Sequence, residues 1–377
     1  MKPAGRAVVT ACALALGGCS YIPFMGDDAK KPMPLAEFKA TVTPKVAWSA
    51  SVGASGSYRF MPRLEGNRVF AAAADGTVTL LDAENGSVVQ RLDAKRKLSS
   101  GAGGQGELVI VGTVKGEVVA VELSGKEKWV TSVGGEVLAP VVVAGATGIV
   151  RTADGRIFAL NLADGKRRWV YQRPTPALLL RAETAVIATT TNVVAGYPGG
   201  KLVALDMDDG KLTWEVTVSL PRGATELERV ADVAGLPVID GGRICAGAFQ
   251  GKVACFDIQS GNTVWTRDLS TATGLAVDDR SVYLTDDQDN VHALSRESGA
   301  STWKQDKLLR RRLTAPVAFD GKVVVGDSLG FLHVLAKDDG AMIGRLALGS
   351  GAVNAIVPAN SGLIVQTAGG TVSFVRF

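Results

Sequence analysis

One unit of about forty residues recurs eight times along this chain. Each copy has an apolar segment, a Gly turn, a second apolar segment that ends near Asp, a second Gly turn and, in most copies, Trp. The first-turn position falls at Gly76, Gly116, Gly155, Gly200, Gly251, Asp289, Gly330 and Gly370. The intervals between these positions are 40, 39, 45, 51, 38, 41 and 40 residues. Units this short and regular are incompatible with independent domains, although the length of 377 residues alone would suggest two or three.

The segment after each first turn is apolar on both faces. The residue two places after the turn is apolar in every unit: Val78, Val118, Ile157, Leu202, Val253, Val291, Leu332 and Val372. The residue five places after it is also apolar: Leu81, Val121, Leu160, Leu205, Phe256, Leu294, Leu335 and Val375. Even and odd offsets point to opposite faces of a strand, so this strand is expected to be buried on both sides. The sequence therefore predicts an all-β fold, an eight-bladed β-propeller of four-stranded antiparallel blades.

Tryptophan marks the end of most units and indicates how the ring closes. Four residues after the second turn stand Trp129, Trp169, Trp214, Trp265 and Trp303, with Gln90 and Gly344 at this position in two further units. The eighth unit does not reach this position, and the sixth Trp of the chain is Trp48, near the N-terminus. We therefore expect residues 45–53 to supply the outer strand of blade eight, so that residues 44–377 form a ring closed by the N-terminal strand.

Composition excludes several classes of function. The formal charge is only +4, with both signs interspersed, so a nucleic-acid-binding protein is not indicated. Four Cys and two His leave little material for a metal site, and we predict none; no nucleophile motif is present either, so no catalytic residue is predicted. The Gly-rich stretches lack the strand-to-helix setting of a phosphate or dinucleotide loop.

The first eighteen residues have the pattern of a bacterial signal peptide. Lys2 and Arg6 flank the start of an apolar run, residues 7–16, that is too short to span a bilayer. The run ends in Leu-Gly-Gly-Cys at 16–19, which resembles the lipobox of bacterial lipoproteins and implies cleavage before Cys19 and lipidation of Cys19. Ser20 then favours the outer membrane, on its periplasmic face. Residues 19–43 are the expected lipidated Cys and tether, and the alternative is an ordinary secretory signal with a chance Cys.

The repeat resembles the tryptophan-docking repeat of pyrroloquinoline-quinone dehydrogenases, and two families that share it have to be separated. The enzymes are longer and need an adjacent Cys pair, which this chain does not have. The lipobox, the bare propeller and the segments 48–53, 176–185 and 228–233 instead resemble the BamB family of the outer-membrane β-barrel assembly (BAM) machinery, over residues 37–377.

The second resemblance implies a non-enzymatic scaffold lipoprotein without a cofactor. Members of this family bind the periplasmic POTRA domains of BamA and assist the assembly of outer-membrane β-barrel proteins. Unfolded clients are further candidate partners, through strand addition to a blade edge. The propeller itself is expected to be monomeric, and a small periplasmic quinoprotein dehydrogenase is the alternative function.

Two segments carry the partner-binding hypothesis. The family motif Leu-x-Leu-Arg maps onto Leu178, Leu180 and Arg181, and the motif Asp-x-Asp maps onto Asp232 and, at its second place, Ala234. Since Ala234 has no carboxylate, Glu226 or Glu228 is the candidate for the second acidic contact, and Arg229 belongs to the same segment. The alternative reading of Leu178 and Leu180 is an inner strand with Arg181 at its solvated end.

The long repeat intervals support this hypothesis independently. We attribute them to extra residues at about 191–199, between the second and third strands, and at 218–235, between blades. Loops of both kinds emerge on one face of a propeller, and residues 178–181 follow a connection between blades. The three segments are therefore expected to lie together, where a partner would dock.

Several signals that look chemical have simpler explanations. Cys245 and Cys255 are expected to lie opposite each other in a hairpin, either as a candidate disulfide or as two small apolar side chains. His292 and His333 occupy equivalent positions in successive units and are expected to be structural. The basic runs 95–97 and 310–312 are interpreted as solvated loops, with a second contact surface as the alternative.

Overall fold

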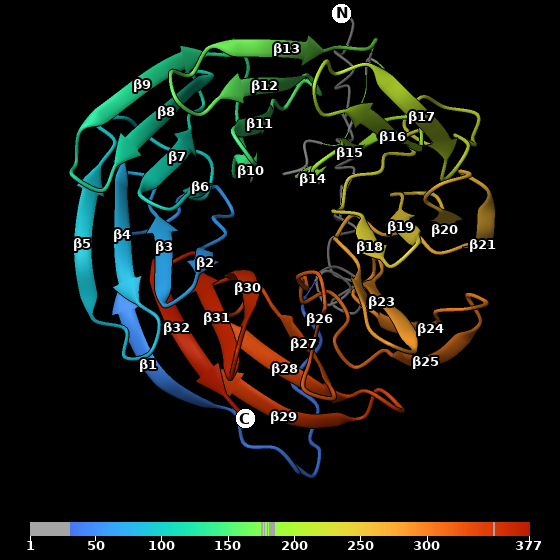
Figure 1. Cartoon of the computed structure of the whole chain (residues 1–377). Coiled ribbons are helices and arrows are strands. Elements are labelled where there is room, and N and C mark those ends of the chain that lie inside the picture. Colours follow the sequence, from blue (N-terminus) through green and yellow to red (C-terminus); the bar gives the residue numbers. More distant parts are fainter. Residues whose placement is uncertain (1–30, 175, 177, 179, 181–184, 350) are drawn as a thin grey trace, which may run out of the picture.

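The computed structural model describes residues 31–377, apart from 175, 177, 179, 181–184 and 350. Eight four-stranded antiparallel sheets are arranged around a central axis in chain order, as Figure 1 shows. The predicted eight-bladed propeller is thereby confirmed. The predicted signal peptide, Cys19 and Arg181 lie outside the described residues. Within the described ranges there is no helix long and apolar enough to cross a membrane.

Each blade has an inner, a second, a third and an outer strand. The inner strands are β2 (Arg63–Glu65), β6 (Gly103–Gln105), β10 (Val142–Ala144), β14 (Ile187–Ala188), β18 (Val238–Asp240), β22 (Ala276–Val277), β26 (Val317–Phe319) and β30 (Val353–Ala359). The second strands are β3 (Arg68–Ala72), β7 (Leu108–Gly112), β11 (Thr147–Arg151), β15 (Asn192–Tyr197), β19 (Arg243–Gly247), β23 (Ser281–Thr285), β27 (Lys322–Gly326) and β31 (Gly362–Thr367). The third strands are β4 (Thr77–Asp82), β8 (Glu117–Glu122), β12 (Ile157–Asn161), β16 (Lys201–Asp206), β20 (Val253–Asp257), β24 (Val291–Ser295), β28 (Phe331–Ala336) and β32 (Thr371–Arg376). The outer strands are β5 (Val88–Asp93), β9 (Glu127–Ser132), β13 (Arg167–Tyr171), β17 (Leu212–Thr217), β21 (Thr263–Arg267), β25 (Ser301–Gln305), β29 (Met342–Ala347) and, in blade eight, β1 (Lys45–Ser51).

The third strands form the most buried layer. In β4, for example, four consecutive residues from Val78 to Leu81 are buried, so side chains on both faces of the strand are removed from water. The core accordingly consists of apolar clusters between neighbouring blades, one of which joins β4 to β7 and β8. This burial confirms the expectation from the even and odd offsets, and it is what face-to-face stacking of blades requires.

Blade eight is built from both ends of the chain. β1 pairs with β32 antiparallel, from Lys45 opposite Arg376 to Ser51 opposite Thr371, and the sheet order is β1-β32-β31-β30. The predicted closure by the N-terminal strand is therefore confirmed.

Tryptophan side chains join neighbouring blades. Trp48, Trp129, Trp169, Trp265 and Trp303 each donate an indole N–H to a turn carbonyl of the next blade, over 2.8–2.9 Å: Ala83, Leu162, Met207, Arg296 and Lys337. Each ring also packs on a turn glycine of that blade, which has a positive φ: Gly86, Gly165, Gly210, Gly299 and Gly340. A Cβ on these glycines would lie 2.4–2.6 Å from the indole ring, so the joint requires both the Trp and the Gly.

Three blades depart from this joint. In blade one, Gln90 stands at the Trp position and donates its amide N–H to the carbonyl of Leu123 in blade two. In blade four, Trp214 is only partly buried, and the equivalent Gly261 faces Val216 instead. In blade seven, Gly344 stands at the Trp position, and a Cβ there would lie 2.9 Å from the carbonyl oxygen of Val42.

The turns between second and third strands and the connections between blades lie on one face, which we call the connection face. Backbone bonds show this directly: the N–H groups of Ala94, Val133, Val218 and Leu348, each just after an outer strand, donate to Gly76, Gly116, Gly200 and Gly330. The opposite face carries the turns between third and outer strands.

The location of one insertion differs from the sequence expectation. Residues 192–197 form β15, followed by a short turn, so the extra residues are not at 191–199. They lie instead in the connection 172–186, between β13 and β14, which is longer than the connections 94–102 and 133–141. β14 has only two residues, too few for an alternating pattern to mark in the sequence where the connection ends. The second insertion does lie between blades, in the connection 218–237.

Candidate partner-binding site

The Leu178–Leu180 segment lies in the connection between blades three and four. The side chain of Leu178 is 48% exposed, whereas Leu180 is half-buried. The backbone N–H of Leu180 donates to Oδ2 of Asp232 over 2.7 Å. The structure therefore brings together two of the predicted segments, 52 residues apart in the chain.

Asp232 joins the connection that holds Leu180 to the turns of blades four and five. Its Oδ1 accepts a hydrogen bond from the N–H of Gly199, in the turn after β15, over 3.3 Å. Its backbone carbonyl accepts from the N–H of Phe249, in the turn after β19, over 2.9 Å. With only 4% of its surface exposed, the Asp232 carboxylate is turned inward, where it positions the backbone of Leu180. A buried acceptor with two backbone donors is expensive to remove.

The neighbouring loop, residues 220–229, is shaped by hydrogen bonds between its side chains and its own backbone, and some of its exposed side chains are apolar. Thr225 and Glu228 form a capping box: Oε2 of Glu228 accepts from the N–H of Thr225 over 3.0 Å, and the N–H of Glu228 lies 3.3 Å from Oγ1 of Thr225. These backbone bonds hold the pKa of Glu228 below its usual value. Nε of Arg229 donates to the carbonyl of Gly223 over 3.0 Å. Both predicted site residues of this loop are thus engaged in shaping it.

The structure adds residues that sequence reasoning missed. Leu220 and Leu227 are 64% and 68% exposed, on the same connection as Asp232. The side-chain amide of Gln250, a residue at a positive φ, lies 3.1 Å from the carbonyls of Leu227 and Val230, and we assign its NH₂ group to that side because only a donor fits two carbonyl oxygens. The Thr-x-x-Glu spacing at 225–228 was a readable signal for the capping box, but nothing in the repeat marked the exposed leucines.

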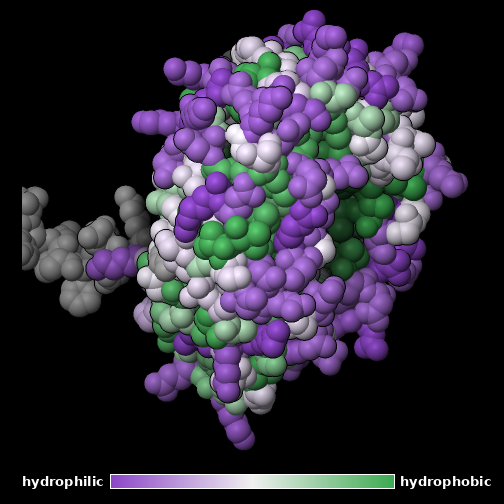
Figure 2. Space-filling model, turned by 60° about the vertical axis from the view of Figure 1, so that its left-hand side comes forward, coloured by the Kyte–Doolittle hydropathy of each residue, from purple (hydrophilic) through white to green (hydrophobic). Residues whose placement is uncertain are grey.

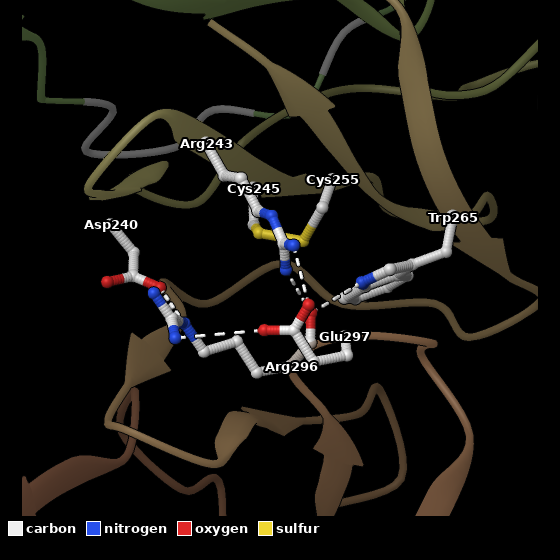
Figure 3. Close-up of a disulfide and its surroundings, with 7 residues drawn as sticks. All are labelled: Asp240, Arg243, Cys245, Cys255, Trp265, Arg296 and Glu297. Carbon is white, nitrogen blue, oxygen red and sulfur yellow. Dashed lines mark hydrogen bonds and ion pairs between the residues drawn. A yellow bond between two sulfur atoms is a disulfide. The ribbon is translucent and has the colours of Figure 1, made fainter.

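The two internal cysteines are joined by a disulfide in the structure. Cys245 of β19 and Cys255 of β20 stand directly opposite each other, with their Cα atoms 4.0 Å apart, in the non-hydrogen-bonded register. Figure 3 shows the bond beside Trp265 and a group of charges from blades five and six. In this group Arg243 pairs with Glu297 at 2.6 Å, and Arg296 pairs with Asp240.

Replacing both Cys245 and Cys255 by Ala is expected to lower the free energy of unfolding by about 2–3 kcal/mol, because the bond restrains a short loop of the unfolded chain. Urea unfolding of the oxidised protein, the reduced protein and the double variant measures this, and the last two should agree. Thiol labelling under denaturing, non-reducing conditions is the control. Labelling of both residues in the unreduced protein would contradict the disulfide.

The two histidines are structural. Nε2 of His292 lies 2.8 Å from Asp286 and Nε2 of His333 lies 2.9 Å from Asp327, each within its own blade. Asp327 also accepts from Nε of Arg311 over 2.7 Å, and all three side chains of the blade-seven cluster are buried. Arg311, the centre of the basic run 310–312, is therefore part of the core and not of a solvated loop. Among the described residues no group of His, Cys, Asp and Glu is arranged to hold a metal ion.

Burial, together with the charges of this cluster, sets the pKa of His333. Burial lowers the pKa of His333 below 6.5 although its hydrogen bond to Asp327 acts in the opposite direction, and Arg311 and Arg345 lower this pKa further. Since Arg311 already neutralises Asp327, a second cation would leave an uncompensated buried charge. For Asp327, burial raises the pKa, but hydrogen bonds from His333, the Phe331 N–H and Arg311 bring it below its usual range.

Stability is therefore expected to fall with acidification, starting near pH 6.5. Below that pH the unfolded chain binds a proton at His333 that the folded chain does not, and each pH unit costs up to about 1.4 kcal/mol. Asp327 adds to the loss only at lower pH, below its ordinary value of 3.8. Urea unfolding at pH 7 and pH 5 tests this. His333→Gln keeps a donor for Asp327 but cannot take the proton, and an unchanged pH dependence in this variant would contradict the assignment.

The outer rim differs from the connection face. Figure 2 turns the side of the ring with blades one and two toward the reader and shows mainly hydrophilic residues with small apolar areas between them. Exposed apolar residues on this rim include Val88 and Val89 of β5. They belong to a regular strand, whereas the exposed Leu178, Leu220 and Leu227 lie on long, irregular connections.

Comparison with known proteins agrees with this picture. A family model described as "Outer membrane protein assembly factor BamB" matches residues 74–305. The BamB protein of Bordetella pertussis is 40% identical over 372 residues, which are 98% of this chain and 96% of that protein. BamB of Escherichia coli is 34% identical over 373 residues, 95% of each chain.

Solved structures show the same fold. The crystal structure of BamB from Moraxella catarrhalis has a TM-score of 0.82 and 27% identity, covering 89% of this chain and all of that chain. Quinohemoprotein alcohol dehydrogenase from Comamonas testosteroni has a TM-score of 0.69 at 12% identity, over 76% of that chain, a likeness of fold alone. With a family model over more than half of its length and a relative 40% identical over nearly all of it, this chain belongs to the family of outer membrane protein assembly factor BamB.

Proposed function

We propose that this outer membrane protein assembly factor acts as a non-enzymatic scaffold of the BAM machinery, binding the POTRA domains of BamA through its connection face. One observation carries the proposal: Asp232 holds the exposed Leu178 segment against the turns of blades four and five. Family membership supports the role in assembly of outer-membrane proteins. Unfolded outer-membrane clients are further partners that this role implies.

The contact residues have different tasks within the proposed site. Leu178 is the proposed apolar anchor because its side chain is exposed, and Arg181, three positions later in the sequence, is the proposed cation. Leu180 and Asp232 fix the path of the segment. Glu228 and Arg229 shape the adjoining loop, where Glu226, exposed and 3.7 Å from Arg229, is the more accessible acid.

The proposed location is the periplasmic face of the outer membrane, through lipidation of Cys19. A diacylated and N-acylated Cys provides stable anchoring, because each buried CH₂ contributes about 0.8 kcal/mol. The prediction comes from the lipobox sequence at 16–19 and is tested by the mass of the N-terminal peptide of the membrane-bound protein.

Binding to the purified POTRA domains of BamA tests the site. Leu178→Ala is expected to weaken binding about tenfold, as for an interface anchor. Leu212→Ala is the matched control, because Leu212 is 49% exposed but lies on an outer strand of blade four. A Leu180→Ala, Arg181→Glu double variant that binds normally would show that the site is wrong. Failure of the unaltered chain to co-purify with BamA would show that the function is wrong as well.

A further inference from the structure

The segment before β1 is held against the propeller over most of its described length. Residues 33–44 fall in or next to the stretch expected to be a free tether, yet hydrogen bonds join them to blade seven and to the connection before it. We call residues 33–44 the strap. Residues 33–43 of the expected tether are therefore bound to the propeller.

The first end of the strap is clamped by the basic run 310–312. The N–H of Met33 donates to the carbonyl of Leu309 over 3.0 Å, and Nη1 of Arg311 donates to the carbonyl of Met33 over 2.7 Å. Nε of Arg310 donates to the carbonyl of Lys31 over 2.7 Å. Arg310 and Arg312 have φ values of 59° and 53°, a conformation unfavourable for residues with a Cβ. Such a backbone persists where the surrounding structure determines it, and here it turns Arg311 inward toward Asp327.

The middle of the strap lies along the outer strand β29. Nη2 of Arg345 donates to the carbonyl of Ala36 over 2.8 Å, and the same guanidinium lies 4.9 Å from the centre of the Phe38 ring. The N–H groups of Thr41 and Val42 both donate to the carbonyl of Ile343, over 2.9 and 3.0 Å. Ala36 and Phe38 also pack on the apolar cluster between blades six and seven.

Gly344 is the residue that leaves room for the strap. It occupies the Trp position of blade seven, and a Cβ there would meet the Val42 carbonyl at 2.9 Å and Cδ of Pro44 at 3.2 Å. In blade eight the third and outer strands come from opposite ends of the chain, so Val42 and Pro44 stand where other blades have a turn. A Trp at position 344 would therefore collide with the strap, which explains why blade seven has Gly there.

The two ends of the strap lie on opposite faces of the ring. Its first end contacts Leu309 to Arg311, in the connection between blades six and seven, and hence on the connection face. Its second end precedes β1, which runs toward the connection 52–62, so Pro44 is on the opposite face. We propose that the strap fixes the exit of the tether on the connection face, so that the membrane anchor and the partner-binding segments act from the same face.

The strap also limits how far the propeller stands from its anchor, if Cys19 is lipidated as in the proposed function. Cys19 precedes Lys31 by 12 positions, an extended reach of at most about 40 Å. Without the strap the free chain would run from Cys19 to Pro44, 25 positions and about 85 Å, and would leave from the face that does not carry Leu178.

Spin-label distances test the exit without depending on lipidation or on the partner. The full chain carries Cys12→Ser and Cys19→Ser and one label at Asp28→Cys. A second label is placed either at Leu329→Cys, an exposed position in the second-to-third-strand turn of blade seven, or at Asp338→Cys, exposed in its third-to-outer turn. From Met33, five residues of extended chain reach at most about 18 Å. We expect a short, narrow distance distribution to position 329 and a longer one to position 338.

Releasing the strap should remove the short, narrow distance distribution to position 329. Arg310→Ala, Phe38→Ala and Arg345→Ala together leave Arg311 and Asp327 intact, and should broaden the distribution to position 329 and speed hydrogen exchange at the Thr41 and Val42 amides. Lys97→Ala, an exposed basic residue of another connection, is the control and should change neither. A label at position 28 that lies closer to 338 than to 329 in the unaltered chain would overturn the proposal. So would a distribution to 329 that the triple variant leaves unchanged while its exchange increases.

Discussion

Trp48→Ala should lower the free energy of unfolding by about 3–5 kcal/mol, the cost of truncating a buried aromatic residue. Trp48 is 8% exposed, its ring packs on Gly86 and lies 6.0 Å from Phe374, and its indole N–H bonds the Ala83 carbonyl. It therefore joins blade eight to blade one through the N-terminal strand. Urea unfolding followed by far-ultraviolet circular dichroism measures the loss.

Trp214→Ala is the matched control for this joint. Trp214 occupies the same position in blade four, but it is only partly buried and Gly261 of the next blade faces Val216 instead. Trp214→Ala should therefore lower the free energy of unfolding clearly less than Trp48→Ala does. Where Trp48→Ala does not fold, Trp48→Phe keeps most of the packing and loses the hydrogen bond, about 1 kcal/mol. Equal losses for Trp48→Ala and Trp214→Ala would show that docking on the next blade does not stabilise the ring.

The second large effect is expected at Asp232. Asp232→Ala leaves the N–H groups of Leu180 and Gly199 without their acceptor, and each unsatisfied group costs about 1–3 kcal/mol. The Leu178 segment then loses its fixed path and has to be ordered when the partner binds. Each 1.4 kcal/mol of this ordering cost lowers the affinity for the POTRA domains about tenfold. Hydrogen exchange at the Leu180 amide should accelerate in the same variant.

Two further variants separate positioning from direct contact. Asp232→Asn retains one carbonyl acceptor and should fall between Asp232→Ala and the unaltered protein. Glu226→Ala removes an exposed carboxylate of the same connection and should leave the Leu180 amide unchanged. If Asp232→Ala abolishes binding while the Leu180 amide exchanges as before, the carboxylate acts on the partner directly and the positioning role is refuted.

The sequence predicted the ring well because its determinants repeat. Val78 and Leu81 lie on opposite faces of β4, and their equivalents do so in each of the remaining third strands. Eight copies of one pattern therefore reinforce each other. The closing strand could be predicted from Trp48 alone, since it was the Trp left over after the other units had been assigned.

The parts that sequence reasoning missed depend on contacts between distant residues. The strap has no periodicity of its own, and it is fixed by Arg311 and Arg345, which lie 278 and 309 residues away from their strap carbonyls. Gly344 in the Trp position was its readable sign. The motif at Asp232 indicated an acidic contact, but burial of a loop residue depends on the turns around it, which no local pattern reports.

The pairing of β1 with β32 also affects the order in which the parts of the ring can fold. A chain made from its N-terminus produces β1 first and β32 last, so the ring stays open until nearly all of the sequence is present. The first seven blades can form from local contacts, but this last pairing is the most non-local of all and is expected to be slow. Until it forms, two unpaired strand edges remain available to other chains. The open ring is therefore the stage of folding at which this chain is expected to be most prone to pair with other chains.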